Sequence, residues 1–116
     1  MPEVTIYHNP RCRKSREGLQ ILKDAGLEPV IVKYLETPPT VEELKNIIDK
    51  LKIHPYELIR KNEKEFKELN LKEMKEDRNA LIQAMAENPR LIQRPIVVKG
   101  DKAILGRPPE NINEIF

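Results

Sequence analysis

The sequence contains one cysteine, no tryptophan and no apolar run long enough to form a membrane span. A single cysteine cannot form an internal disulfide, so nothing indicates an oxidising compartment. A transmembrane helix needs about 20 predominantly apolar residues, and the chain offers no stretch of that length. The N-terminus enters a strand-like run at once, without the basic and apolar segments of a signal peptide. We therefore expect a cytoplasmic protein that does not bind membranes.

The chain also lacks a large excess of either charge, because 21 Lys and Arg residues against 19 Asp and Glu residues leave a net charge of only +2. Such a balance gives no reason to expect nucleic acid as a partner. One cysteine and two separated histidines, His8 and His54, form no metal-ligand cluster. A chain of 116 residues suits a single domain, residues 1–116, and we expect it to be a monomer.

The first third of the chain has the pattern of a parallel βαβ unit. Residues 4–7 are a compact β-branched and aromatic run that predicts a buried strand. Apolar positions in residues 13–25 fall mainly on one helical face, and Gly26 stands where a C-terminal cap belongs. Residues 30–32 predict a second buried strand. A strand, a helix and a parallel strand make a right-handed crossover.

The middle of the chain is helical in pattern. Thr40 and Glu43 form a capping box, which predicts the start of a helix. The lysine- and glutamate-rich residues 61–78 indicate one or two short, exposed helices. Asp77 or Asn79 could start the helix that follows.

The last quarter predicts a β-hairpin followed by a short helix. Strands are expected at residues 96–98 and 103–105, with a Gly-Asp turn signal between them. A βαβ unit followed by ββα on one mixed sheet is the thioredoxin-like arrangement, here with a helical insertion at about residues 40–90 between its halves. In that architecture a cis proline faces the active site, and Pro95 holds this place before the third strand.

The one cysteine, Cys12, lies at the junction between the first strand and the first helix. A thiol there meets the positive end of the helix dipole and free backbone N–H groups, which favour the thiolate. Four cationic side chains within four residues act in the same direction: Arg11, Arg13, Lys14 and Arg16. The alternative is an inert small hydrophobe, but such a cysteine normally has apolar neighbours.

Five segments spread over nearly the whole chain form a more specific pattern than any single motif. They are Ile6-Tyr7-His8-Asn9-Pro10-Arg11-Cys12 with Ser15-Arg16, Tyr34-Leu35-Glu36-Thr37-Pro38-Pro39, Leu58-Ile59-Arg60-Lys61-Asn62, Leu91-Ile92-Gln93-Arg94-Pro95-Ile96-Val97-Val98 and Gly106-Arg107-Pro108. In type and order these segments resemble the arsenate reductase family of the ArsC type, whose members are linked to glutaredoxin. The chain would be a short member of that family.

The resemblance implies a thioredoxin-like fold and a cysteine, Cys12, that attacks a bound tetrahedral oxyanion. It implies that arginines at three positions bind the anion: Arg60, Arg94 and Arg107. Arginine suits this task, since its planar fork pairs N–H donors with oxyanions and keeps its charge. The matching histidine, His8, is implied to help keep the thiolate ionised. The implied reaction is reduction of arsenate to arsenite through a covalent Cys12–arsenic intermediate.

Turnover needs a second thiol, and the chain has none besides Cys12. Where a dithiol oxidoreductase carries C-x-x-C, this motif ends in Ser15, which we expect to cap the helix or to donate a hydrogen bond to Cys12. The resolving thiol must therefore come from another molecule. The resemblance implies glutathione followed by glutaredoxin, and no bound cofactor is expected.

Two other functions stay open at this point. Spx-like transcription regulators share the fold and bind RNA polymerase, but their redox-sensing members usually carry the C-x-x-C pair that Ser15 interrupts. A general monothiol oxidoreductase, which resolves mixed disulfides, is the other alternative.

The Arg13-Lys14 pair departs from the family pattern, in which small or polar residues more often follow the cysteine.

Overall fold

The computed structural model of the chain describes residues 3–115 and contains two compact units. The first unit comprises the residues up to 37 and those from 94 onward, and the second comprises residues 38–93. The helical insertion expected at about residues 40–90 falls within the second unit. Within residues 3–115, no helix is long and apolar enough to cross a membrane, and no group of three or more His, Cys, Asp or Glu side chains could hold a metal ion.

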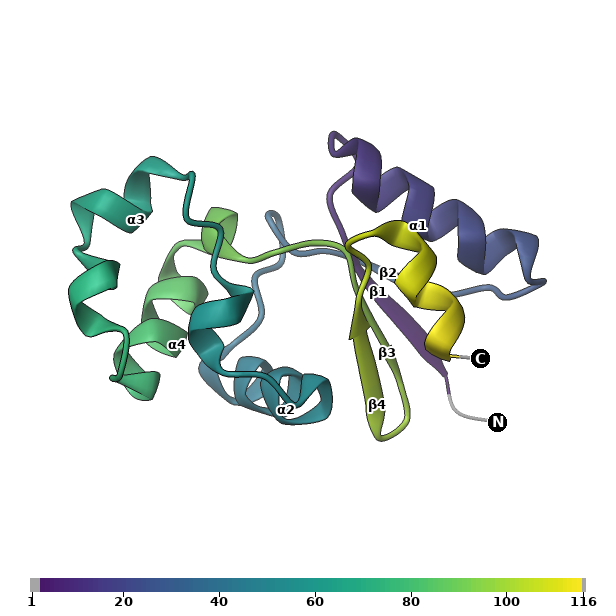
Figure 1. Ribbon diagram of the computed structural model, residues 1–116. Helices are drawn as coiled ribbons and strands as arrows, with labels where there is room; N and C mark the ends of the chain where they lie inside the picture. The colour runs from purple at the N-terminus through teal and green to yellow at the C-terminus, as the bar shows by residue number, and fades with distance from the viewer. Residues whose placement is uncertain (1–2, 116) are drawn as a thin grey trace. The chain divides into compact units, whose positions relative to one another are not determined.

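The first unit is built on a four-stranded mixed sheet in the order β2-β1-β3-β4 (Figure 1). The strands are β1 (Val4–His8), β2 (Val30–Lys33), β3 (Ile96–Lys99) and β4 (Lys102–Leu105). β1 runs parallel to β2, and helix α1 (Arg13–Asp24) connects them. β1 pairs antiparallel with β3, and β3 pairs antiparallel with β4 in a hairpin. The predicted order of βαβ followed by ββα is therefore confirmed.

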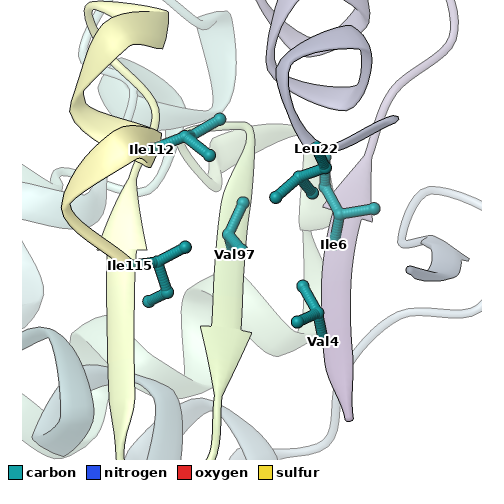
Figure 2. Packing of buried hydrophobic residues seen from close by; sticks show 6 residues of the cluster. All are labelled: Val4, Ile6, Leu22, Val97, Ile112 and Ile115. Atoms are coloured by element: carbon teal, nitrogen blue, oxygen red, sulfur yellow. The ribbon is translucent and has the colours of Figure 1, made fainter. Parts of the chain in front are cut away.

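One face of this sheet carries the hydrophobic core of the first unit. Figure 2 shows residues from β1, α1, β3 and the 3-10 helix η4 (Pro109–Ile115) that pack together: Val4, Ile6, Leu22, Val97, Ile112 and Ile115. Burial alternates along β1, as a period of two requires when one face packs against helices. Each fully buried Leu or Ile contributes roughly 1.5–3 kcal/mol to stability. This cluster fixes α1 on the sheet and so positions the segment that leads from β1 into α1.

The prediction that the second strand is buried is wrong. Val30 and Ile31 are 41% and 43% exposed, and no residue of β2 is buried. Within the described residues, β2 is an edge strand that pairs only with β1. A short β-branched run looks the same in a central and in an edge strand, because strand order depends on contacts far away in the sequence.

The second unit consists of short helices, as the sequence predicts. They are α2 (Val41–Leu51), η1 (Pro55–Leu58), α3 (Lys64–Glu68), η2 (Leu71–Met74), α4 (Arg78–Glu87) and η3 (Pro89–Leu91). The predicted capping box is present: the Glu43 amide donates to the Thr40 hydroxyl at 3.1 Å, and the Thr40 amide donates to the Glu43 carboxylate at 3.0 Å. Asp77 is the N-cap of α4. Helix α2 buries three residues at helical spacing: Leu44, Ile47 and Ile48.

Pro95 is held at the start of β3 by close packing. The Arg94–Pro95 peptide bond is cis, as the architecture predicts, and a second cis bond precedes Pro108. The Gly106 amide donates to the Pro95 carbonyl at 2.9 Å. A Cβ atom on Gly106 would lie 2.8 Å from Pro95 Cγ and 2.9 Å from Ile112 Cδ1, so only glycine fits here without movement of a neighbour.

We predict that Gly106→Ala destabilises the protein by about 1–3 kcal/mol, because the added methyl group forces Pro95 or Ile112 to move. The free energy of unfolding from urea titration measures this effect. Lys102→Ala, an exposed change in the neighbouring β4, is the control and should stay within about 0.5 kcal/mol of the wild type. A Gly106→Ala protein as stable as the wild type would contradict the packing around Pro95.

Candidate active site

The segment between β1 and α1 folds into a tight turn that ends at Cys12. The Cys12 amide donates to the Asn9 carbonyl at 3.0 Å, and the Arg11 amide donates to Asn9 Oδ1 at 3.0 Å. Cys12 is the N-cap residue of α1, with an extended backbone, and it is partly exposed. The turn thus delivers the thiol to the N-terminal end of the helix, where the sequence predicts it.

The surroundings of Cys12 favour its thiolate. Burial is the largest single influence, and it raises the pKa of the thiol. Hydrogen bonds from the Ser15 amide, the Arg94 guanidinium and the Lys14 amide, together with the charge of Arg94, outweigh burial and leave the pKa below its ordinary value. The first amides of α1 therefore act on the sulfur as the sequence predicts.

Two of the basic side chains next to Cys12 have other partners. Arg13 Nε forms an ion pair with the Glu17 carboxylate at 2.9 Å on the exposed side of α1. Arg16 Nη1 donates to the Pro10 carbonyl at 3.0 Å. The cation that lowers the pKa of Cys12 is instead Arg94, which is far away in the sequence.

Arg94 reaches this turn because of the register between β1 and β3. Tyr7 pairs with Ile96 in the antiparallel ladder, so the chain that follows β1 lies beside the chain that precedes β3. Two Arg94 nitrogens, Nε and Nη1, are buried and form no hydrogen bond within residues 3–115. Because unpaired buried donors on a charged group are costly, they indicate a place where an anion can bind.

Arg107 lies next to Arg94, and Arg60 belongs to the other unit. Arg107 is exposed, and its Nη1 donates to the Arg94 carbonyl at 3.3 Å. The structure therefore brings together Cys12, Arg94 and Arg107, three of the residues expected at the site. Arg60 lies in the second unit, where its guanidinium pairs with the Glu63 carboxylate at 2.7 Å. Its part in the site stays a prediction.

His8 and Ser15 form a buried pair. His8 Nδ1 and Ser15 Oγ are 2.7 Å apart, and Ser15 Oγ also accepts a hydrogen bond from the Asn9 amide at 3.0 Å. His8 is 5% exposed and Ser15 is fully buried. Among the described residues, the Ser15 hydroxyl neither caps α1 nor bonds Cys12, contrary to expectation. The contact between Ser15 and the sulfur runs through the backbone amide instead.

His8 is held in its neutral form. Burial lowers its pKa most, while a hydrogen bond with Ser15 acts in the opposite direction. Positive charges nearby lower the pKa further: those of Lys33, Arg16 and Lys23. A neutral imidazole cannot balance the charge of a thiolate, so any effect of His8 on Cys12 runs through Ser15.

Asn9 is a site residue that the sequence does not reveal as one. From the sequence, Asn9-Pro10 is only a break after the first strand. In the structure, the carbonyl, side chain and amide of Asn9 each hold part of the cysteine turn. The available signal is the Asn-Pro pair itself, since asparagine side chains in turns often bond the backbone two residues further on.

Comparison with known proteins gives a consistent result. The model of the ArsC family matches residues 7–115. The uncharacterized protein YfgD of Escherichia coli K12 is 51% identical over 114 residues, which cover 97% of this chain and 96% of the relative. An arsenate reductase of Neisseria meningitidis is 45% identical over 117 residues, which cover 100% of both chains. The solved structure of an arsenate reductase from Vibrio cholerae is 48% identical and has a TM-score of 0.95, covering 99% of this chain and 98% of that one.

We predict that Arg94→Gln raises the pKa of Cys12, because it removes a hydrogen bond and a positive charge from the thiolate. The rate of alkylation by iodoacetamide follows the thiolate fraction, so its pH profile should move to higher pH and its value at neutral pH should fall. Arg13→Gln removes an exposed charge next to the cysteine and should leave the profile in place. Equal shifts in both variants would contradict the role of Arg94.

Ser15→Ala should separate the roles of the serine hydroxyl and amide. Without the hydroxyl, the Asn9 amide and His8 Nδ1 lose a partner, which should lower the free energy of unfolding in urea by about 1–3 kcal/mol. The Ser15 amide still reaches the sulfur, so the alkylation profile of Cys12 should move less than in Arg94→Gln. A larger shift, with stability unchanged, would mean that the hydroxyl bonds the thiolate directly.

Proposed function

Because the chain belongs to the ArsC family, we propose that it is an arsenate reductase, which converts arsenate to arsenite with electrons from external thiols. One observation carries this proposal. The Cys12 thiol has a lowered pKa and lies beside Arg94, whose two buried nitrogens bind nothing within residues 3–115. A nucleophile next to unsatisfied cationic donors suits an oxyanion that reacts as an electrophile.

The first step is attack of the Cys12 thiolate on arsenic. Arsenate is an anion at neutral pH, so its approach to a thiolate causes repulsion that cations must offset. Arg94 and Arg107 supply positive charge from the first unit, and a guanidinium fork matches paired oxyanion oxygens. The family resemblance implies that Arg60 also binds the anion, and this part stays a prediction. A sulfur–arsenic(V) bond forms, and one arsenate hydroxyl leaves as water after taking up a proton.

The second step needs an external thiol, because Cys12 is the only cysteine. The external thiolate attacks the Cys12 sulfur: a disulfide bond forms, the sulfur–arsenic bond breaks, and its electron pair stays on arsenic, which leaves as arsenite. A second external thiol then attacks the mixed disulfide and restores Cys12. Two thiols are thus oxidised to one disulfide for each arsenate reduced. We assign glutathione to the first thiol and glutaredoxin to the second, as the family resemblance implies.

His8 supports this chemistry as a positioning residue. It is neutral and bonds the Ser15 side chain, not the sulfur. By holding Ser15, it keeps the first turn of α1 in the place where the Ser15 amide reaches the thiolate. The expected contribution of His8 to the ionised thiol is therefore indirect.

A general monothiol oxidoreductase is the second candidate. The lowered pKa of Cys12 supports it equally, since a thiolate also attacks disulfide sulfur. The buried, unpaired donors of Arg94 favour the oxyanion reaction, because a disulfide bond offers them no negative charge. The ranking of the two candidates therefore depends on Arg94.

Purified protein with arsenate, glutathione and glutaredoxin should form arsenite, measured by chromatography with elemental detection. Cys12→Ser should abolish this activity, because a serine hydroxyl without a strong base is a weak nucleophile. Arsenate should also protect Cys12 from iodoacetamide. Arg94→Gln should weaken that protection roughly ten- to a hundredfold, since a hydrogen bond to a charged group contributes about 1.5–3 kcal/mol.

Arg13→Gln is the matched control for the protection experiment, because its charge is exposed and paired with Glu17. It should leave protection by arsenate unchanged. A wild-type protein that forms no arsenite with any thiol donor, yet rapidly reduces mixed disulfides, would favour the second candidate.

A further inference from the structure

A cavity lies beside the cysteine turn, within the first unit. Its volume is about 290 Å³, and it is lined by residues 8–11 and by Lys33, Leu35 and Glu36. Cys12, Arg94 and Arg107 do not line it, so it is distinct from the proposed oxyanion site. Ligand cavities span roughly 300–1,000 Å³, and this one lies just below that range. One small molecule, or the end of a larger one, fits.

The charged side chains around this cavity are of both signs. Arg11 and Lys33 are cationic and Glu36 is anionic, and within residues 3–115 none of the three forms an ion pair. Burial of His8, on the cavity wall, lowers its pKa most, and the charge of Lys33 is the next largest cause. The wall therefore has a positive potential that attracts carboxylates, whereas Glu36 offers a partner for an ammonium group.

The cavity is lined in part by the turn that leads to Cys12. Asn9 and Arg11 line it, and both belong to the turn that carries Cys12. The Cys12 amide donates to the Asn9 carbonyl at 3.0 Å, and Arg11 immediately precedes Cys12. A molecule anchored in the cavity thus contacts the turn that carries the nucleophile. Pro10 and Leu35 add apolar surface to its lining.

We propose that this cavity is the binding place of the glutathione-type thiol assigned above, and that it holds the carboxylates and the ammonium group of that peptide. The proposal rests on the proposed function, in which such a thiol attacks the sulfur of Cys12. Arg11 and Lys33 bind the carboxylates, and Glu36 binds the ammonium group. Leu35 packs against the methylene groups, so that the thiol of the peptide can reach the sulfur.

Thiol–disulfide exchange tests this site without arsenate. The Cys12 thiolate attacks glutathione disulfide, a Cys12–glutathione disulfide forms, and one glutathione thiolate leaves, so no further oxidant is needed. Bis(2-hydroxyethyl) disulfide is uncharged and reports the intrinsic reactivity of Cys12. Mass spectrometry of the intact protein gives both rates. Their ratio cancels any change in the thiolate fraction.

The double variant Arg11→Gln, Lys33→Gln should lower this ratio roughly three- to tenfold, and Glu36→Gln should lower it roughly twofold. Lys102→Gln removes an exposed charge from β4 and should leave the ratio unchanged. 3,3′-Dithiodipropionic acid has the same net charge as glutathione disulfide but lacks the ammonium and peptide groups. Its rate should not fall in Glu36→Gln.

An unchanged ratio in the double variant would overturn the proposal. So would an equal loss with 3,3′-dithiodipropionic acid in all variants, because attraction by net charge would then explain the whole effect. These outcomes are independent of arsenate turnover. A protein that shows the expected ratios but forms no arsenite would overturn the proposed function and leave the peptide-thiol site in place.

Discussion

A half-buried thiolate must be stabilised by groups that the chain brings to it, and this requirement shapes the first unit. Burial alone raises the pKa of Cys12, and the Ser15 amide, the Arg94 guanidinium and the Lys14 amide reverse the effect. The two amides come with the start of α1. Arg94 comes only because β1 and β3 pair antiparallel, which places the end of one strand beside the beginning of the other. The register of the sheet is therefore a condition of the chemistry.

The charges near the sulfur do not cancel one another. Arg94 has donors left over after its bond to Cys12, and Arg107 adds a second guanidinium beside it. His8 adds no charge, because burial and the neighbouring cations keep it neutral. The site thus has an excess of positive charge over the single thiolate. Such an excess suits a reaction in which two negatively charged species, a thiolate and an oxyanion, have to approach each other.

Features determined by residues close together in the sequence could be predicted, whereas features that depend on contacts between distant residues could not. The capping box of Thr40, the positive φ of Gly26 and the hairpin of β3 and β4 are local, and the structure has all three. The exposure of β2 depends on strand order, which no local pattern contains. The sequence marks Arg94 only by its place between an apolar run and Pro95, and its contact with Cys12 appears only once the sheet is assembled. The sequence predicts the wrong partner for the Ser15 hydroxyl, because a serine near the start of a helix usually caps that helix. In this structure Cys12 occupies the N-cap position instead.

The position of Cys12 as the N-cap of α1 also affects how good a leaving group its sulfur is. Groups that stabilise a thiolate stabilise it equally when it is the product of a reaction, and a thiol with a lowered pKa is the better leaving group. Any disulfide formed on Cys12 is therefore easily cleaved with expulsion of this sulfur. The helix terminus and Arg94 thus favour both the attack by the Cys12 thiolate and its later release from a disulfide. The protein therefore returns readily to the form with a free Cys12.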